Sequence, residues 1–450
     1  MQSRNKPKLP RFLATIGRLF RWLAPGLGVK RWGLLIVLGT TLISLGFAVV
    51  LLELYRTTPD RWYLPLIALL SLRFLSRPIR ALVFGMGGLL LIVIGVWGIN
   101  RTLLRPFIRP GKHLLDSVTH FQKRDRGPKI VVIGGGTGLS ALLRGLKKHS
   151  SNITAIVTVA DDGGSSGELR RTTGMLPPGD IRNCLTALSS DEELLSQLFQ
   201  YRFGEGAGLN GHSLGNLLIT ALTDITGSFE EAVAESGRVL AVQGKVLPST
   251  LHDVCLVAEV EVPGEAKVVR IRGESGIPKA AGKIKRVWLE PDNPLAYPPT
   301  IQALLNADMI IMGPGSLYTS ILPNLLVSDI NEALRVSRAL KFYICNITTQ
   351  PGETDGFSCG DHIRVIEKYI GKHLFDTVIC NDNCGGRLPA GVEFACLEEG
   401  LEKEYPIYSS DLVNSEAPWR HDSERLANAI IDLYNERTGP MLTRENDLDL

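Results

Sequence analysis

The sequence predicts an α/β protein built on a mostly parallel sheet with helices on both faces. From residue 129 onward, short apolar runs typical of buried strands alternate with apolar residues at helical spacing. Residues 255–290 differ, because short alternating runs are interrupted by Pro-Gly and glycine-rich turns, which indicates a small β-rich insertion. Two long apolar stretches before residue 100 add an N-terminal transmembrane helical hairpin to this prediction.

The composition is that of a large globular chain. Its 450 residues are 44% apolar and 21% charged, which is enough to bury a full core and to form more than one structural unit. The net charge is +3, and most of the basic excess lies in the first 130 residues. The remainder is close to neutral or acidic, so we expect no nucleic-acid partner.

The two apolar stretches, residues 32–55 and 81–99, are each long enough to cross a bilayer as a helix. The first is interrupted only by Glu53, and the second contains no charge. The short apolar segment at residues 62–72 leaves open a re-entrant piece, an interfacial piece or a third span. The simplest prediction is a two-helix membrane hairpin over residues 32–100.

Basic residues flank this hairpin on both sides. The N-terminus, residues 1–31, and a juxtamembrane linker, residues 101–127, each carry more Lys and Arg than the connecting loop. The positive-inside tendency then places both chain ends in the cytoplasm. We therefore expect a multi-pass protein of the inner (cytoplasmic) membrane, with a soluble domain in the cytoplasm and no cleaved signal peptide.

Cysteine usage agrees with a cytoplasmic domain. The number of cysteines is odd and no C-x-x-C motif occurs, which predicts reduced thiols. Cys380 and Cys384 are weak evidence for a zinc site, because no second Cys or His pair accompanies them. The seven cysteines are Cys184, Cys255, Cys345, Cys359, Cys380, Cys384 and Cys396.

The soluble domain is predicted over residues 128–437, with a C-terminal tail at residues 438–450. Apolar residues at helical spacing in 423–437 predict a closing helix. Parallel α/β sheets bind ligands at the carboxyl ends of their strands. The loops that follow the predicted strands are therefore the candidate functional site.

A glycine cluster separates the first predicted strand from a helix. Glycine allows a turn with positive φ, and the N–H groups at the helix start favour an anion. A dinucleotide, another phosphate ligand and a tight turn without a ligand all fit this motif taken alone, because a single G-x-G-x-x-G/A match is weak. The candidate residues are Gly134, Gly135, Gly136, Thr137 and Gly138.

Two adjacent carboxylates, Asp161 and Asp162, follow the next predicted strand and precede a Gly-Gly-Ser-Ser-Gly loop. A dinucleotide site needs only one acid at this point. The pair makes Mg²⁺ a candidate cofactor, with sugar hydroxyls and phosphate oxygens as other partners and a solvated loop as the structural alternative. Ser165 and Ser166 in the same loop complete this group.

Two further polar clusters precede helices. Arg182 suits a phosphate, whereas Asp180 either pairs with that arginine or caps the helix. Ser213 beside His212 suggests a nucleophile, but neighbours at a helix start point in different directions and no third triad member is evident. Capping and phosphate contact explain these residues more simply. The candidates are Asp180, Arg182, Asn183, His212, Ser213 and Asn216.

A second strand, glycine turn and helix follows within residues 309–325, and its small hydroxyl side chains again suit a phosphate. The later loop at residues 345–362 is dense in polar groups, of which cap and turn roles explain about half. The candidates in these two segments are Gly313, Pro314, Gly315, Ser316, Thr319, Ser320, Asn346 and Gln350.

These clusters occur together as GGGTG, DDGGSSG, PPGDIRN, GHSLGN, GPGSLYTSILPN and TQPGETDG. In this combination the sequence resembles the gluconeogenesis factor (YvcK-like) family, within the CofD-like superfamily of 2-phospho-L-lactate transferases. The resemblance covers roughly residues 128–435, so the predicted membrane hairpin lies outside it.

The resemblance implies a Rossmann-like domain that binds a UDP-sugar such as UDP-N-acetylglucosamine and acts in cell shape and cell-wall precursor allocation. The transferase relatives move a phospholactyl group from a guanosine donor to a deazaflavin precursor, with Mg²⁺ at acidic residues. By this resemblance the glycine turn, Asp161 and Asp162 border the substrate cleft. The nucleotide would be faced by His212, Ser213, Asn216, Gly313, Pro314, Gly315, Ser316, Thr319 and Ser320.

Three functions follow as hypotheses: a UDP-sugar-binding regulator, a Mg²⁺-dependent transferase and, least favoured, an NAD-dependent oxidoreductase. The DDGGSSG loop differs from the transferase pattern and resembles that of the YvcK-like branch. For this reason no catalytic residue is assigned. The expected partners are a nucleotide sugar, the membrane and the cell-wall synthesis machinery. A homo-oligomer is compatible with the sequence.

Overall fold

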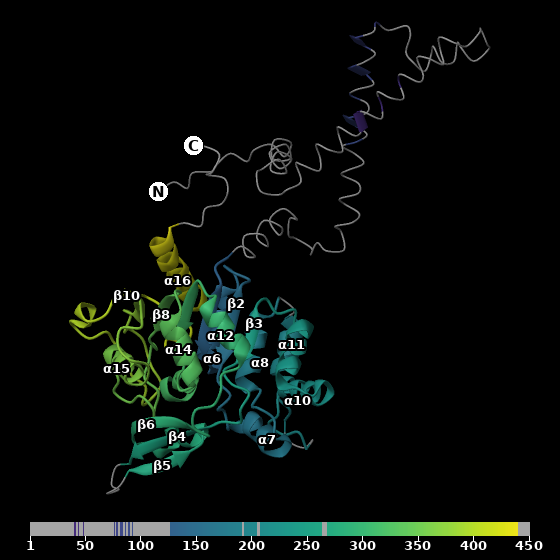
Figure 1. Ribbon diagram of the computed structural model, residues 1–450. Coiled ribbons are helices and arrows are strands. Elements are labelled where there is room, and N and C mark those ends of the chain that lie inside the picture. The colour runs from purple at the N-terminus through teal and green to yellow at the C-terminus, as the bar shows by residue number, and fades with distance from the viewer. Residues whose placement is uncertain are drawn as a thin grey trace. The chain divides into compact units, whose positions relative to one another are not determined.

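The computed structural model describes residues 127–190, 193–204, 208–262 and 268–439, together with isolated positions between Thr40 and Ile92. A seven-stranded sheet lies at the centre of the first four segments (Figure 1). Its order is β10-β9-β8-β7-β1-β2-β3, and every adjacent pair is parallel. This confirms the predicted α/β fold with a large parallel sheet. The strands are β1 (Ile130–Gly134), β2 (Ile153–Val157), β3 (Lys245–Pro248), β7 (Met309–Met312), β8 (Leu340–Ile344), β9 (Thr377–Asn381) and β10 (Ile407–Ser410).

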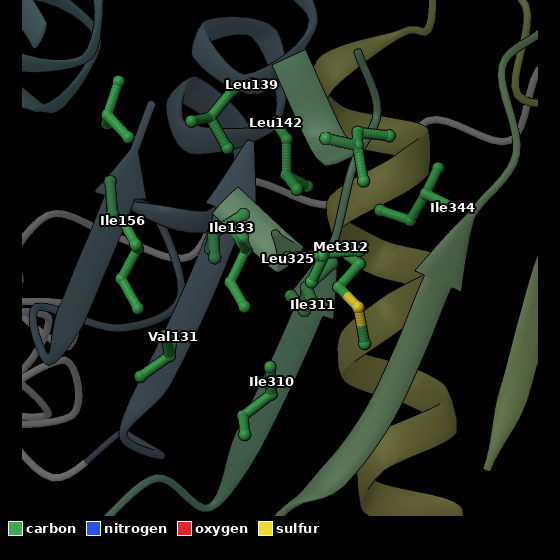
Figure 2. Close-up of a cluster of buried hydrophobic side chains, with 14 of the residues drawn as sticks. Val131, Ile133, Leu139, Leu142, Ile156, Ile310, Ile311, Met312, Leu325 and Ile344 are labelled. Atoms are coloured by element: carbon green, nitrogen blue, oxygen red, sulfur yellow. The ribbon is translucent and has the colours of Figure 1, made fainter. Parts of the chain in front are cut away.

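The central strands are buried on both faces. All residues of β1, β7 and β9 are buried, as expected where helices cover both sides of a parallel sheet. Figure 2 shows Ile156, Ile133 and Ile310 on three adjacent strands, with Leu139 and Leu142 from the helix that follows β1. Burying a side chain of this kind stabilises the fold by about 1.5–3 kcal/mol. This core holds the carboxyl ends of the strands in fixed positions.

The strand order reverses between β7 and β1. From β1 the chain crosses to β2 through α6 (Gly136–Leu146). From β7 it crosses in the opposite direction to β8, through α13 (Leu322–Leu325) and α14 (Ser328–Val336). Since such crossovers are right-handed, α6 and α14 lie on opposite faces of the sheet. Open α/β sheets form a ligand crevice at a reversal of this kind.

The remaining helices complete the two layers. α6 packs on both α8 (Gly179–Leu188) and α16 (Ser423–Thr438), and α12 (Pro298–Leu305) packs on α14 (Figure 1). The others are α7 (Gly164–Thr173), α9 (Glu193–Gln200), α10 (Leu214–Thr226), α11 (Phe229–Val239), α15 (Cys359–Ile370), the short helices η2 (Glu274–Gly276), η3 (Pro278–Ala280) and η5 (Leu401–Lys403), and the π-helical turn η4 (Leu317–Ile321).

A three-stranded antiparallel sheet lies apart from the large one, in the range where the sequence predicts a β-rich insertion. Its order is β5-β4-β6, with β4 at Cys255–Glu261, β5 at Val269–Arg272 and β6 at Lys283–Glu290. The turn after β5 forms η2, and its first residue, Glu274, reaches the cleft described below.

Within the part of the chain that the structure describes, no helix has the length and apolarity needed to cross a bilayer. A crossing takes about 20 apolar residues in one helix. This finding contradicts the predicted location in the inner membrane and leaves the predicted transmembrane hairpin without support. The predicted spans at 32–55 and 81–99 lie outside the described residues except at isolated positions, and residues 1–31, 101–126 and 440–450 lie outside them entirely.

Cys384 and Cys396 form a disulfide. The prediction of seven reduced thiols is therefore wrong at these two positions. The chain folds back after β9, and Ala395 donates its N–H to the carbonyl oxygen of Ile347 at 2.9 Å, which brings Cys396 beside Cys384. Cysteine spacing carries no information about such a fold-back.

Candidate functional site

A cleft of about 970 Å³ opens where the strand order reverses, at the carboxyl ends of β1 and β7. Loops that are far apart in the chain form its walls, so residues from five of the six clusters predicted from sequence line one cavity, whereas those of GHSLGN do not. The predicted residues that line it are Gly135, Gly136, Thr137, Gly138, Asp161, Asp180, Asn183, Pro314, Gly315, Ser316, Ser320, Asn346 and Gln350.

The glycine turn after β1 packs closely on the loop after β7. Gly136 has a φ of +66°, which favours glycine. A Cβ atom at Gly138 would approach the carbonyl oxygen of Pro314 to 2.6 Å, so a side chain there would force the two loops apart. The N-cap residue of α6, Gly135, has no side chain to cap the helix, and the Asp180 carboxylate accepts the N–H of Gly136 there. The positive end of the α6 dipole therefore faces the cleft, where it favours an anion.

Asn346 holds the loop after β7 in place. Its Nδ2 donates to the carbonyl oxygen of Gly315 at 2.8 Å, and its Oδ1 accepts from the N–H of the same residue at 3.1 Å. Asn324 donates to the carbonyl oxygen of Gly134 at 3.1 Å, and the N–H of Gly313 donates to the carbonyl oxygen of Ile133 in β1 at 3.0 Å. Gly134 and Gly313 thus belong to the frame of the cleft and do not line it.

Carboxyl groups gather at one part of the cleft. Burial raises the pKa of Asp180 to about 6, the charge of Asp161 adds to the shift, and the N–H of Gly136 opposes it. Burial also raises the pKa of Asp161, against hydrogen bonds that include the Ser166 hydroxyl. Glu274, which the sequence analysis does not select, joins them, and burial followed by the neighbouring carboxyls raises its pKa well above the ordinary value. Together, these three carboxyl groups would accept hydrogen bonds from ligand hydroxyls and would repel a phosphate.

Asp162 points away from Asp161. Its Oδ1 accepts the N–H of Ser275 at 2.8 Å, and its Oδ2 lies where an added Cβ at Gly273 would collide with it. Adjacent residues of an extended loop direct their side chains apart, so only Asp161 of the two lines the cleft. Asp162 instead anchors η2 and thereby places Glu274.

The predicted Mg²⁺ pair therefore does not form a joint site. Among the residues that the structure describes, no group of three or more His, Cys, Asp or Glu side chains is arranged to hold a metal ion. Mg²⁺ requires near-ideal octahedral oxygen geometry. The carboxylates of Asp161 and Asp162 are directed to different surroundings, so the two do not chelate one metal ion in this geometry.

A hydrogen-bonded network orients Ser316 at the edge of the cleft. Gln350 donates from Nε2 to the Ser316 hydroxyl at 2.6 Å, and Ser316 donates to Oε1 of Glu353 at 3.4 Å. Thr319 donates to the same carboxylate oxygen at 3.2 Å. Burial raises the pKa of Glu353 to about 7, against these hydrogen bonds. Thr319 is thus a support for Ser316 and does not line the cleft.

Two arginines that the sequence analysis does not select line the cleft, Arg144 on α6 and Arg420 just before α16. Burial, followed by the charge of Arg420, lowers the pKa of Arg144, so the two guanidinium groups lie near each other. Paired guanidinium groups suit a diphosphate. Trp419, which is 41% exposed, and His421 line the same wall. The run of polar and aromatic residues directly before the helix capped by Asp422 is the sequence signal that points to them.

Ser165, His212 and Asn216 form a buried chain of hydrogen bonds that does not line the cleft. Asn216 donates from Nδ2 to the Ser165 hydroxyl at 3.0 Å, and this hydroxyl lies 3.0 Å from Nδ1 of His212. Nε2 of His212 lies 3.5 Å from Oε2 of Glu168. Ser213 is the N-cap of α10 and accepts from the Asn216 N–H at 3.2 Å. These residues join the DDGGSSG loop to α10.

Arg182 is also absent from the lining of the cleft. Its buried guanidinium donates from Nη2 to Oδ1 of Asn183 at 2.8 Å, and Asn183 itself lines the cleft. Asn183 therefore links Arg182 to the lining of the cleft.

Comparison with known proteins identifies the family. The family model described as 2-phospho-L-lactate transferase CofD matches residues 130–390. A putative gluconeogenesis factor from Nostoc sp. is 53% identical over 376 residues, which are 81% of this chain and 79% of the relative. The gluconeogenesis factor of Bacillus subtilis is 46% identical over 324 residues, which are 69% of this chain and 99% of the relative.

The crystal structure of a UPF0052-family protein from Bacillus halodurans is 45% identical, covers 68% of this chain and 99% of its own, and superposes with a TM-score of 0.63. The resemblance drawn from the clustered motifs is thus confirmed by sequence and by fold. The chain belongs to the gluconeogenesis factor (YvcK-like) family, within the CofD-like superfamily.

Proposed function

We propose that the cleft binds a nucleotide sugar of the UDP type and that the protein acts as a regulator which senses this ligand. The observation that carries the proposal is that the first turn of α6, at Thr137 and Gly138, and two arginines line one cleft at the reversal of strand order. The diphosphate would lie between the start of α6 and the guanidinium groups of Arg144 and Arg420. Helix dipole and guanidinium charge favour the same anionic group.

The sugar would lie toward Asp161, Asp180 and Glu274. Burial raises the pKa of each of these carboxyl groups, and their oxygens accept hydrogen bonds from sugar hydroxyls. A phosphate would be repelled from this group. The uneven charge along the cleft therefore supports a ligand with a diphosphate at one end and a polyhydroxylated ring at the other.

A regulatory role fits the family. Relatives at 46–53% identity carry the name gluconeogenesis factor, which refers to carbon supply and to no particular reaction. We infer that the cleft binds a cell-wall precursor. Its occupancy would report how much carbon has entered the synthesis of that precursor. The partner that receives the signal would belong to the cell-wall synthesis machinery.

Calorimetric titration of the full chain with UDP-N-acetylglucosamine, GDP and NAD tests this function. The proposal expects binding of the UDP-sugar in preference to the other two. Arg420→Met should weaken that binding by at least about tenfold, since it removes a charged hydrogen-bond donor to phosphate. Arg387→Met, at an exposed position that does not line the cleft, is the matched control. Absence of UDP-sugar binding, or an unchanged affinity in Arg420→Met, contradicts the proposal.

A transferase is the second candidate, because the matching family model is described as a 2-phospho-L-lactate transferase. Its test is turnover: the chain is incubated with Mg²⁺, a guanosine-linked phospholactyl donor and a deazaflavin acceptor, and product is followed by chromatography. Product formation that depends on the cleft residues favours the transferase. UDP-sugar binding without turnover favours the regulator.

A further inference from the structure

Arg182 is a buried cation with most of its hydrogen-bonding capacity unused. It is 6% exposed and lies on α8, where it donates from Nη2 to Asn183. Its Nε and Nη1 atoms are shielded from solvent and have no hydrogen-bond partner. A buried charged donor left without a partner is energetically costly, and such a group in a native protein calls for an explanation such as a bound ion, a bound water or a catalytic role.

The surroundings of Arg182 contain a second unsatisfied group. The side chain packs against Gly215 at the start of α10, where an added Cβ would approach Cδ of Arg182 to 2.8 Å. The next residue, Asn216, is 1% exposed, and its Oδ1 atom has no partner although its Nδ2 donates to Ser165. Arg182 on α8 and Asn216 on α10 thus both carry buried polar atoms without a partner, and α8 packs on α10.

The charges around Arg182 do not replace the missing hydrogen bonds. Burial and the charge of Arg202 lower the pKa of Arg182 to about 10, while Asp180 and Asp161 oppose this shift. Arg182 therefore remains a cation at neutral pH. Asp180 receives the N–H of Gly136 and lies against Gly135, so its carboxylate is engaged at the glycine turn. The Nε and Nη1 donors of Arg182 are therefore available to an additional anion.

We propose that Arg182 forms a second anion subsite, separate from the diphosphate site at Arg144 and Arg420. It would take a phosphate or carboxylate group that enters past Asn183, the half-buried side chain which lines the cleft and now accepts from Arg182. Asn216 Oδ1 would accept from a protonated oxygen of that group. The inference goes beyond the nucleotide-sugar proposal, because it assigns a second ligand, or a second anionic end of one ligand.

The test uses the full chain in a phosphate-free buffer, with inorganic phosphate and acetate as probes. Each anion is titrated while the thermal unfolding midpoint is recorded, because a ligand that binds only the folded state raises it. Arg182→Met should weaken binding of the preferred anion by at least about tenfold. Arg182→Lys, which keeps the charge, should retain part of it. Arg171→Met, on the exposed face of α7, is the matched control and should bind as the parent does.

A second readout separates a ligand site from a structural role. If Arg182 serves a ligand, Arg182→Met should unfold at the same or a higher temperature than the parent without anions, since a buried unpaired charge is replaced by an apolar side chain. Failure of the wild-type chain to respond to either anion overturns the proposal. So does an Arg182→Met variant that responds as the parent does, or one that is destabilised while its anion affinity is unchanged. Titration of Arg182→Met with the UDP-sugar reports independently on the proposed diphosphate site at Arg144 and Arg420.

Discussion

Oδ2 of Asp180 lies so close to Gly135 that a Cβ atom added to this glycine would approach it to 2.6 Å. The methyl group of Thr158 would lie 3.1 Å from the same added atom. Asp180 also accepts the N–H of Gly136. The first turn of α8 thereby holds the glycine turn that follows β1, and one buried acid sets the shape of the cleft at its base.

Gly135→Ala tests this contact. The new methyl group must displace Asp180 or the glycine turn, so we expect the free energy of unfolding to fall by about 1–3 kcal/mol. Affinity for UDP-N-acetylglucosamine should fall with it, because the start of α6 moves. Urea unfolding and calorimetry measure the two effects. Gly204→Ala, where an added Cβ meets open space, should behave as the parent does; equal loss in both variants would exclude the steric explanation.

We expect Asp162 to contribute to the stability of the fold and not to the binding of a metal ion. Asp162→Ala removes the acceptor for the Ser275 N–H and should cost about 1–3 kcal/mol of unfolding free energy, with weaker ligand binding because Glu274 is released. Asp162→Asn keeps Oδ1 as an acceptor and should be nearly silent. Calorimetry with and without Mg²⁺ decides the matter: loss of a Mg²⁺ effect in Asp162→Asn alone would show that this residue binds the metal.

Glu353 should make stability depend on pH. Its pKa is raised from 4.5 to about 7, so between these values the folded chain binds more protons than the unfolded chain. The free energy of unfolding therefore falls as the pH rises through this window. Glu353→Gln can still accept from Thr319 and should lack this contribution. It should be more stable than the parent above the window, by at most about 3 kcal/mol, and equal to it below. Parallel pH profiles of unfolding for both proteins would refute the assignment.

The disulfide between Cys384 and Cys396 closes a loop that carries Pro389 and Val392, both of which line the cleft. Reduction should lower the free energy of unfolding by roughly 3 kcal/mol on the chain-entropy estimate. It should also weaken ligand binding, because this wall of the cleft loosens. Thiol titration of the denatured, unreduced chain should find five free cysteines of seven. A count of seven would show that the bond does not form.

Local sequence patterns determined much of this protein. The run at β1 is apolar on every residue and forms a strand buried on both faces, as predicted. The glycines after β1 and β7 mark the two loops that meet at the reversal of strand order. Ser213 caps α10, one of the roles foreseen for it. These features follow from residues within one turn or one strand of each other, so periodicity and turn chemistry reveal them.

Tertiary structure alone decided which side chains share the cleft. Asp161 and Asp162 are neighbours, yet one lines the cleft and the other anchors η2, because the turn after β5 supplies a donor at Ser275. Arg144 and Arg420 are distant in sequence and line the same cleft because α6 packs on α16. Such meetings depend on strand order and helix packing, which arise from the whole chain folding at once and leave no trace in the spacing of nearby residues.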